Sequence, residues 1–164
     1  MGAPLADNLP EALKAVRTQS LFVMKLDIQP HIVVGPTPGG YRRTVVITGG
    51  RFEGQRVSGK VLEGGSDWQT VRGDGAITLE VKLNLQTDDD ALISMTYRGL
   101  LHGPVDVMQR MGKGEAVDAS SYYLRSQPYF ETSATKYDWI NRIVAIGVGH
   151  RRADGPVYNI FEVL

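Results

Sequence analysis

A carboxylate and an indole stand side by side in the most glycine-rich stretch of the chain. Asp67 and Trp68 lie within "EGGSDWQTVRGDG", residues 63–75. A carboxyl group can move a proton, and its pKa rises when an apolar neighbour removes it from water. Glycine is costly to order, so its density indicates sharp turns or close backbone approach. The stretch predicts a wide loop in which Asp67 and Trp68 line a binding site. The alternative is that Asp67 caps backbone amides and Trp68 fills the end of the barrel.

Further polar side chains near the ends of predicted strands extend this candidate site. As catalytic groups we predict Asp67, Glu131 and Arg98: a carboxyl moves the proton and a guanidinium holds developing negative charge. The predicted substrate-binding residues are Arg43, Trp68, Arg72, Tyr97, Trp139 and Asn141. Together, carboxylates, guanidiniums and phenols suit an oxygen-rich organic ligand. Taken singly, most of these side chains are expected to be solvated or structurally paired.

Metal and cofactor chemistry find little support in the sequence. The histidines are His31, His102 and His150. They are so far apart in sequence that folding would have to bring three separate segments together to form a shared metal site. "GKGE", residues 112–115, lacks the Walker spacing, and neither a G-x-S-x-G elbow nor a dinucleotide fingerprint occurs. With Cys 0, a thiolate nucleophile and a disulfide are excluded. We therefore predict no metal and no cofactor.

The overall charge and hydropathy narrow the classes of partner. The 18 basic and 18 acidic residues give a formal net charge of +0, so no strong field attracts a polyanion. The chain offers no run of the ~20 apolar residues that a membrane-spanning helix needs, and it begins without the pattern of an export signal. We expect a cytoplasmic protein that binds a small molecule, with neither nucleic acid nor membrane as partner.

The elements that must position these residues are mostly predicted β-strands. Residues 77–87, "ITLEVKLNLQT", alternate strictly between apolar and polar, which is typical of a strand with one buried face. The predicted strands cover residues 20–29, 41–50, 56–64, 75–87, 91–101, 121–132, 142–152 and 157–163. Strands that follow one another with almost no helix between them favour antiparallel hairpins, which a chain of this size can close into a barrel.

Three segments fall outside the strand pattern. Asn8, Pro10 and apolar residues at helical spacing predict a short helix in an N-terminal extension, residues 1–19, that precedes a barrel domain, residues 20–164. Residues 102–120 are the longest irregular stretch, and loops of this length are often lids or interaction segments. A turn of helix is predicted within "SATKYDWINR", where it would place Trp139 against the barrel end.

Several motifs, in order along the chain, resemble one known family. They are "ITGGRFEGQRVSGKVLEGGSDWQTVRGDG", "LQTDDDALISMTYRGL", "PYFETSATKYDWINRIVAIGVG" and "VYNIFEV". From about Leu21 to the C-terminus the chain resembles the bacterial and fungal family called domain of unknown function 3237. The resemblance implies an all-β fold with a single antiparallel β-barrel of lipocalin-like or calycin-like form, assembled as a homo-oligomer. The sequence departs from the family at Asp90, where glycine is common, and in a longer loop after Leu101.

Three functions remain open. We predict a cofactor-independent enzyme of the lyase, isomerase, cyclase or lactone hydrolase type, which acts by acid–base chemistry on an oxygenated cyclic or aromatic metabolite in a barrel pocket. The alternative is a non-catalytic, lipocalin-like barrel that binds a small molecule without changing it. A third hypothesis is an assembly protein whose barrel centre is packed with side chains, and this hypothesis predicts no pocket.

Overall fold

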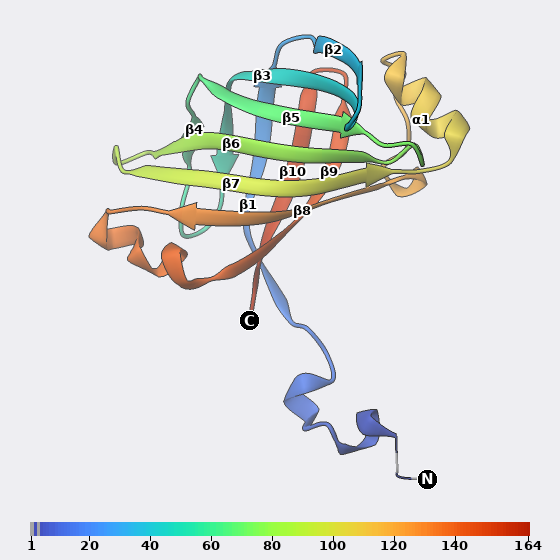
Figure 1. The fold of residues 1–164 in the computed structure, drawn as a ribbon. Coiled ribbons are helices and arrows are strands. Elements are labelled where there is room, and N and C mark those ends of the chain that lie inside the picture. The colour runs from blue at the N-terminus through green and yellow to red at the C-terminus, as the bar shows by residue number, and fades with distance from the viewer. Residues whose placement is uncertain (1, 3) are drawn as a thin grey trace.

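The computed structural model describes Gly2 and residues 4–164, and it confirms the predicted all-β fold with a single antiparallel barrel (Figure 1). The strands are β1 (Thr18–Ile28), β2 (Ile32–Thr37), β3 (Gly40–Glu53), β4 (Gly59–Val61), β5 (Gly65–Val71), β6 (Ile77–Thr87), β7 (Leu92–His102), β8 (Tyr123–Glu131), β9 (Val144–Arg152) and β10 (Gly155–Val163). The helix is α1 (Val105–Gly112), and the 3₁₀ turns are η1 (Leu5–Asn8), η2 (Glu11–Leu13), η3 (Ala119–Ser121) and η4 (Thr135–Arg142).

The strands form a closed ring, and in one place two short strands lie one after the other between the same two neighbours. The order runs from β1 through β10, β9, β8, β7 and β6 to β3, with β4 and β5 both lying between β6 and β3. Pairing of β1 with one half of β3 closes the ring, and β2 pairs with the other half of β3. All of these pairings are antiparallel, as hairpin connections require. The closed ring leaves few unpaired strand edges.

Two strands differ from the sequence prediction. The wide loop expected over residues 63–75 is wrong, because most of it is strand β5, which pairs with β3 on one side and β6 on the other. Hydrogen bonds to two neighbours outweigh the weak strand preference of glycine and aspartate there. Strand β2 was not predicted either; it contains Gly35 and Pro36, which weaken the sequence signal for a strand.

The segment before the barrel is less regular than predicted. Instead of one helix it forms the two 3₁₀ turns η1 and η2, whose residues are not buried. In Figure 1 this segment extends away from the barrel below β1. Met1 and Ala3, which belong to the expected extension over residues 1–19, lie outside the described residues. Without burial of an apolar face, a short helix gains little stability.

Glycines lie where β1 and β3 come closest. A Cβ atom on Gly50 would collide with the backbone oxygen of Lys25, and one on Gly54 would collide with that of Leu21. Only residues without a side chain permit this approach. Part of the glycine density noted in the sequence therefore serves the seam that closes the barrel.

The barrel is plugged differently at its two ends. At the end near η4, Phe22 packs against Phe52 and Phe130, with ring centroids 5.2 Å and 5.9 Å apart. Such tilted and edge-on aromatic pairs make a dense core. At the opposite end α1 lies across the barrel and buries Val107 and Met111 (Figure 1). The aromatic plug is solid, so open space inside the barrel lies toward α1.

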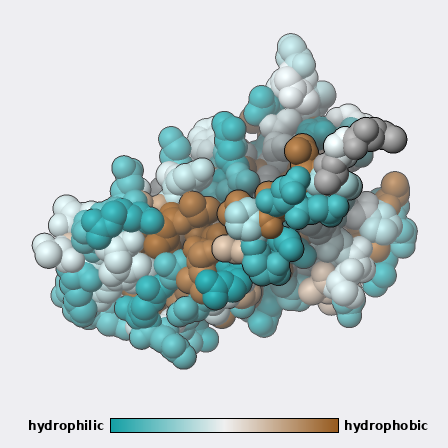
Figure 2. Space-filling view, turned by 90° about the horizontal axis from the view of Figure 1, so that it is seen from below, coloured by the Kyte–Doolittle hydropathy of each residue, from teal (hydrophilic) through white to brown (hydrophobic). Residues whose placement is uncertain are grey.

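The outer surface is mixed in character. Figure 2 shows hydrophobic residues gathered near the middle of the face seen from below, between more hydrophilic regions. Along β9, the outward-facing Val144, Ile146 and Val148 are exposed, and their partners in β10 include Val163 and Phe161. Among the described residues, no helix is both long and apolar enough to cross a membrane.

Candidate functional site

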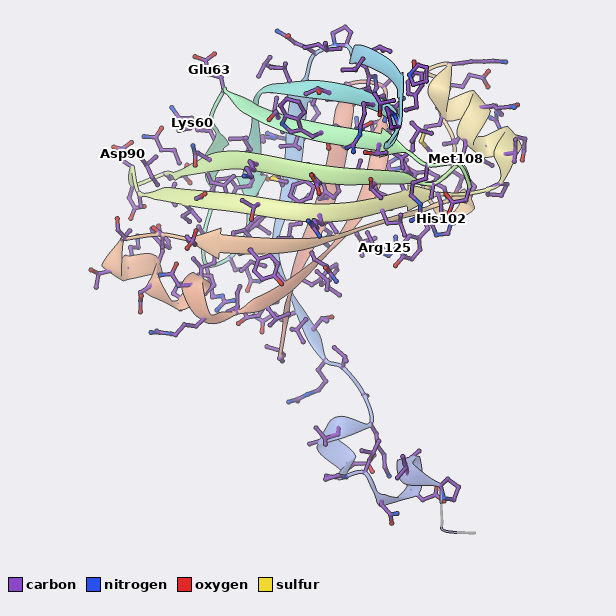
Figure 3. All side chains as sticks on the ribbon, in the orientation of Figure 1. Lys60, Glu63, Asp90, His102, Met108 and Arg125 are labelled. Carbon is purple, nitrogen blue, oxygen red and sulfur yellow. The ribbon has the colours of Figure 1, made fainter. Side chains whose placement is uncertain are left out.

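Two adjoining cavities open at the α1 end of the barrel. The outer one, here called the mouth, has a volume of about 630 Å³, and the inner one has a volume of about 190 Å³. They share the lining residues His31, Leu101, Met111, Gly112 and Arg151. Figure 3 labels His102 and Met108, two other mouth residues, at this end, whereas Lys60 and Asp90 mark the opposite end. A small molecule entering past α1 would reach the inner cavity through this shared neck.

The inner cavity is bordered by the carboxyl group of Asp67. In β5, Asp67 and Gln69 point inward because alternate residues of a strand share a face. The Gln69 side chain donates a hydrogen bond from Nε2 to Asp67 Oδ2 at 2.6 Å. The second oxygen, Oδ1, is buried and has no hydrogen-bond partner among the described residues. Asp67 is thus held by one oxygen and presents the other without a protein partner.

The environment of Asp67 favours the protonated form more than water does. Burial raises the pKa of this carboxyl from 3.8 to about 6, although the hydrogen bond from Gln69, the nearby backbone of Glu80 and the charges of Arg151 and Arg43 act in the opposite direction. Desolvation wins because it penalises the ionised form directly. Near neutral pH, Asp67 can therefore exist in both forms, as a group that exchanges protons must.

Two arginines and a histidine surround the neck. Arg43, on β3, donates from Nε to Gln69 Oε1 at 2.7 Å, so it supports the amide that holds Asp67. Arg151 lies at the end of β9, where its backbone N–H donates to the Tyr122 hydroxyl at 2.7 Å. Burial, followed by the charges of Arg43 and Arg151, lowers the pKa of His31 to about 4. At neutral pH, His31 is therefore uncharged, and its buried Nε2 has no hydrogen-bond partner within the described part of the chain.

Two phenols complete the polar part of the inner cavity. Tyr97, on β7, and Tyr158, on β10, are buried, and their ring centroids lie 5.6 Å apart. Burial raises the pKa of both hydroxyls, and the nearby Asp67 charge raises both further. The two phenols therefore stay protonated, and because their hydroxyls also interact with each other, one O–H of the pair is left to donate into the cavity. The remaining wall is apolar and includes Leu79 and Leu124.

The structure brings together some of the predicted site residues and separates others. Asp67 and Tyr97 line the inner cavity, and Arg43 and Arg72 line the mouth. The predicted residues that line neither of these cavities are Trp68, Arg98, Glu131, Trp139 and Asn141. The arrangement therefore differs from the expectation that all nine side chains converge on one void.

Strand alternation accounts for Trp68 and Arg98. Trp68 follows the inward-facing Asp67 and so points outward; it is 59% exposed, and its indole nitrogen donates to Ser66 Oγ at 2.9 Å. Arg98 likewise follows the buried Tyr97, and its side chain is 82% exposed beside Glu80. A carboxylate and an indole that are adjacent in one strand cannot wall the same site. The aromatic walls beside Asp67 are Tyr97 and Tyr158 instead.

Glu131, Trp139 and Asn141 lie at the opposite end of the barrel. The exposed Glu131 ends β8, and Asn141, in η4, accepts a hydrogen bond from the Thr132 backbone at 2.8 Å. The Trp139 ring lies 4.0 Å from the Arg56 guanidinium carbon, in a cation–π contact. The helical turn expected near Trp139 is present as η4, but it closes the barrel end away from the cavities.

Sequence reasoning missed four residues that the structure places around the site: His31, Gln69, Arg151 and Tyr158. For Gln69 a signal existed, since it is two residues after Asp67 and shares its face if the segment is a strand. Tyr158 also alternates with apolar neighbours in β10. No local signal marks His31 or Arg151, because one lies in the connection between β1 and β2 and the other at the end of β9, and only the closed barrel brings them together.

The histidines do not form a cluster. His31 lies at the neck, His102 stacks on Tyr123 with ring centroids 5.0 Å apart, and His150 Nδ1 lies 2.8 Å from the Tyr122 hydroxyl. Across residues 4–164 the structure contains no group of three or more histidine, aspartate or glutamate side chains placed to hold a metal ion.

The expected irregular stretch over residues 102–120 contains helix α1, which covers the site. Met111 packs into the core cluster and lines both cavities, so α1 forms part of the neck. In the last turn of α1, Arg110 Nε donates to Glu115 Oε2 at 3.0 Å, which ties the helix to the segment that follows it. The segment lies over the mouth of the site, and a lid role for it stays a prediction.

Comparisons with known proteins agree with this architecture. A family model described as "Protein of unknown function (DUF3237)" matches residues 16–163. A UPF0311 protein of Rhodopseudomonas palustris (strain TIE-1) is 36% identical over 149 residues, which cover 91% of this chain and 97% of that protein. The crystal structure of a conserved protein of unknown function from Rhodopseudomonas palustris has a TM-score of 0.89 and 33% identity, and the match covers 92% of this chain and 99% of that one.

A more distant solved structure, that of an enzyme from Penicillium herquei, has a TM-score of 0.71 at 20% identity. The match covers 95% of this chain and 100% of that chain. At this level of identity the likeness shows a shared fold alone.

Proposed function

The chain belongs to the DUF3237 family, and from that premise we propose that it is a cofactor-independent enzyme that uses acid–base chemistry on a small oxygenated molecule in its barrel cavity. The observation that carries this proposal is the Asp67 carboxyl, which borders an internal cavity and has one buried oxygen without a protein partner. A buried, unsatisfied carboxyl destabilises a fold, so its place at a cavity favours a chemical role.

Asp67 supplies the proton transfer in this proposal. With a pKa of about 6, it is largely ionised near neutral pH and can take a proton from a carbon next to a carbonyl group. The same carboxyl, now protonated, can return the proton to another atom of the substrate. This sequence of steps is an isomerisation, or an elimination if a leaving group departs instead. Cyclisation and lactone opening need the same base, acting on a hydroxyl group or on water.

The negative charge that develops on the substrate oxygen has donors nearby. Tyr97 and Tyr158 remain protonated in the buried wall, and Arg151 lies at the neck. Donors that are fixed before the reaction stabilise an oxyanion without having to reorganise. In this proposal, Asp67 moves the proton, and the two phenols together with Arg151 bind the oxygen.

The enzyme from Penicillium herquei, although distant, supports the view that this fold is compatible with catalysis. The alternative function is a non-catalytic barrel that binds a small molecule. It is favoured by one observation, the apolar wall around Leu79 and Leu124, which would hold an apolar ligand without reacting with it. The homo-oligomer expected from the family resemblance stays a prediction.

Native mass spectrometry tests the proposed function against the alternative. The wild-type protein and an Asp67→Asn variant are each purified, incubated with a small-molecule extract of the cells and examined for retained molecules. The matched control is Asp27→Asn, which changes an exposed carboxyl in β1. An enzyme with Asp67 in its proton path converts a molecule that the Asp67→Asn variant retains unchanged. A molecule that all three proteins retain without conversion would favour the binding barrel.

A further inference from the structure

The neck carries two guanidinium groups that form no ion pair with a carboxylate of the described residues. Arg43 lines the mouth, and Arg151 lines both the mouth and the inner cavity. Within residues 4–164, neither side chain forms an ion pair. Burial lowers the pKa of Arg43, and the like charge of Arg151 lowers it further. Two cations held near one another in a partly buried place are unfavourable unless an anion lies between them.

The nearby acids are paired with other cations or are too few to neutralise both guanidiniums. At the rim of the mouth, Asp74 accepts a hydrogen bond from Arg72 at 2.6 Å. Beyond α1, Glu115 accepts one from Arg110 at 3.0 Å. Asp67 is the remaining acid of the inner cavity, and near neutral pH its single negative charge faces the two guanidiniums of Arg43 and Arg151. The neck therefore has excess positive charge, although the whole chain has a formal net charge of +0.

The inner cavity has the size of one ring. A dry cavity of ~150 Å³ lined by aliphatic and aromatic side chains accommodates benzene, and the inner cavity measures about 190 Å³. Its wall combines aliphatic side chains with the rings of Tyr97 and Tyr158. A six-membered ring with one small charged substituent fits this volume, and the mouth of about 630 Å³ leaves room for a larger second substituent.

We propose that the site takes the anion of a small cyclic acid, with its ring in the inner cavity and its carboxylate or enolate oxygen at the neck between Arg43 and Arg151. This inference deepens the proposed function and rests on it for the fate of the bound molecule, because it names the substrate class of the same site. The ring lies against Tyr97 and Tyr158 and within the space that Asp67 borders. An anion at the neck also neutralises the two guanidiniums, and this attraction offsets the cost of removing the anion from water.

The test compares a charged ligand with a neutral one of the same shape. Binding of benzoate and of benzamide to the wild-type protein is measured by isothermal titration calorimetry at about pH 7, where benzoate is ionised. We expect benzoate to bind about tenfold or more tightly than benzamide, because only benzoate brings a negative charge to its hydrogen bonds with the guanidiniums. Equal affinity, or no measurable binding of benzoate, overturns the inference. This comparison uses the wild-type protein and needs no variant.

Variants then locate the charge that benzoate recognises. Arg151→Met should weaken benzoate binding about tenfold and leave benzamide binding unchanged, since methionine keeps the apolar stem and removes the charge. The matched control is Arg125→Met on the outer face of β8, where Arg125 lies over the ring of Tyr123 (Figure 3). Benzoate binding that Arg151→Met leaves unchanged, or that Arg125→Met weakens equally, contradicts the inference.

A third variant separates failure of this inference from failure of the proposed function. Asp67→Asn removes negative charge from the cavity, so it should bind benzoate at least as tightly as the wild-type protein does. If benzoate binds as expected but no substrate is converted in an Asp67-dependent way, the proposed function fails alone. If Asp67-dependent conversion occurs only with neutral molecules and benzoate is not preferred over benzamide, the substrate class fails alone.

Discussion

Replacing Asp67 by asparagine should make the protein more stable at neutral pH while abolishing its activity. The carboxyl of Asp67 is buried beside the cavity, and its Oδ1 has no partner among the described residues, so ionising it in the folded state is costly. Asparagine has nearly the same shape and keeps an oxygen that can accept the hydrogen bond from Gln69. It cannot ionise, so the folded variant avoids the cost of a buried charge.

The size of this effect follows from the pKa shift. The pKa of Asp67 rises from 3.8 to about 6 on folding, a difference of roughly two units. Each unit corresponds to about 1.4 kcal/mol, so ionisation destabilises the folded protein by up to about 3 kcal/mol at neutral pH. Because the folded-state pKa is raised, the folded protein binds more protons than the unfolded chain between these two pH values. The wild-type protein therefore loses this stability as the pH rises from about 4 to about 6, and the variant does not.

Urea unfolding of the wild-type protein, Asp67→Asn and the control Asp27→Asn, measured from about pH 4 to about pH 7.5, checks this prediction. The free energy of unfolding of Asp67→Asn should rise relative to that of the wild-type protein by about 2–3 kcal/mol across this range. Titration of His31 contributes to all three proteins and cancels in the differences. A variant that is less stable than the wild-type protein by the same amount at every pH would refute the reasoning, because Asp67 would then be a satisfied structural group.

Three further predictions follow from the same site. The kcat/KM of the wild-type enzyme should fall about tenfold per pH unit below about pH 6, where Asp67 becomes protonated, and a pH–rate profile that is flat through this region would contradict the role of the carboxylate as base. Met111→Ala should lower the free energy of unfolding by about 2 kcal/mol or more, measured in urea, because it removes a buried side chain where α1 packs onto the core. If the outer face of β9 forms the expected homo-oligomer, Ile146→Asp should yield monomers in size-exclusion chromatography with light scattering, whereas a monomeric wild-type protein would refute the oligomer itself.

Much of the fold can be predicted because its signals are local. The alternation in residues 77–87 is the clearest case, and the structure has strand β6 over Ile77–Thr87 with alternate residues buried. Strand β5 could not be predicted from propensity, since Gly65 and Asp67 are both poor strand formers. Its stability comes from pairing with β3 and β6, which are distant in sequence.

The candidate site is less predictable than the fold because residues from several strands that are distant in sequence must meet to form it. Asp67 stands out from its sequence surroundings, and the structure places it beside the inner cavity. Trp68 and Arg98 also stand out, but each follows an inward-facing residue in its strand. Because side chains alternate between the two faces of a strand, both point outward. Glu131 lies at the opposite end of the barrel because β8 runs from the α1 end toward η4. Arg151 reaches the neck only through closure of the barrel.

The most direct test of Asp67 as a proton-transfer group is the incorporation of solvent deuterium into carbon. Wild-type, Asp67→Asn and Asp27→Asn proteins are incubated in D₂O with a small-molecule extract of the cells, and carbon-bound deuterium in the molecules is measured by mass spectrometry. We expect at least one molecule to gain deuterium with the wild-type protein and with Asp27→Asn, and at a rate lower by about a hundredfold or more with Asp67→Asn. Equal deuterium incorporation by Asp67→Asn and the wild-type protein would contradict the account.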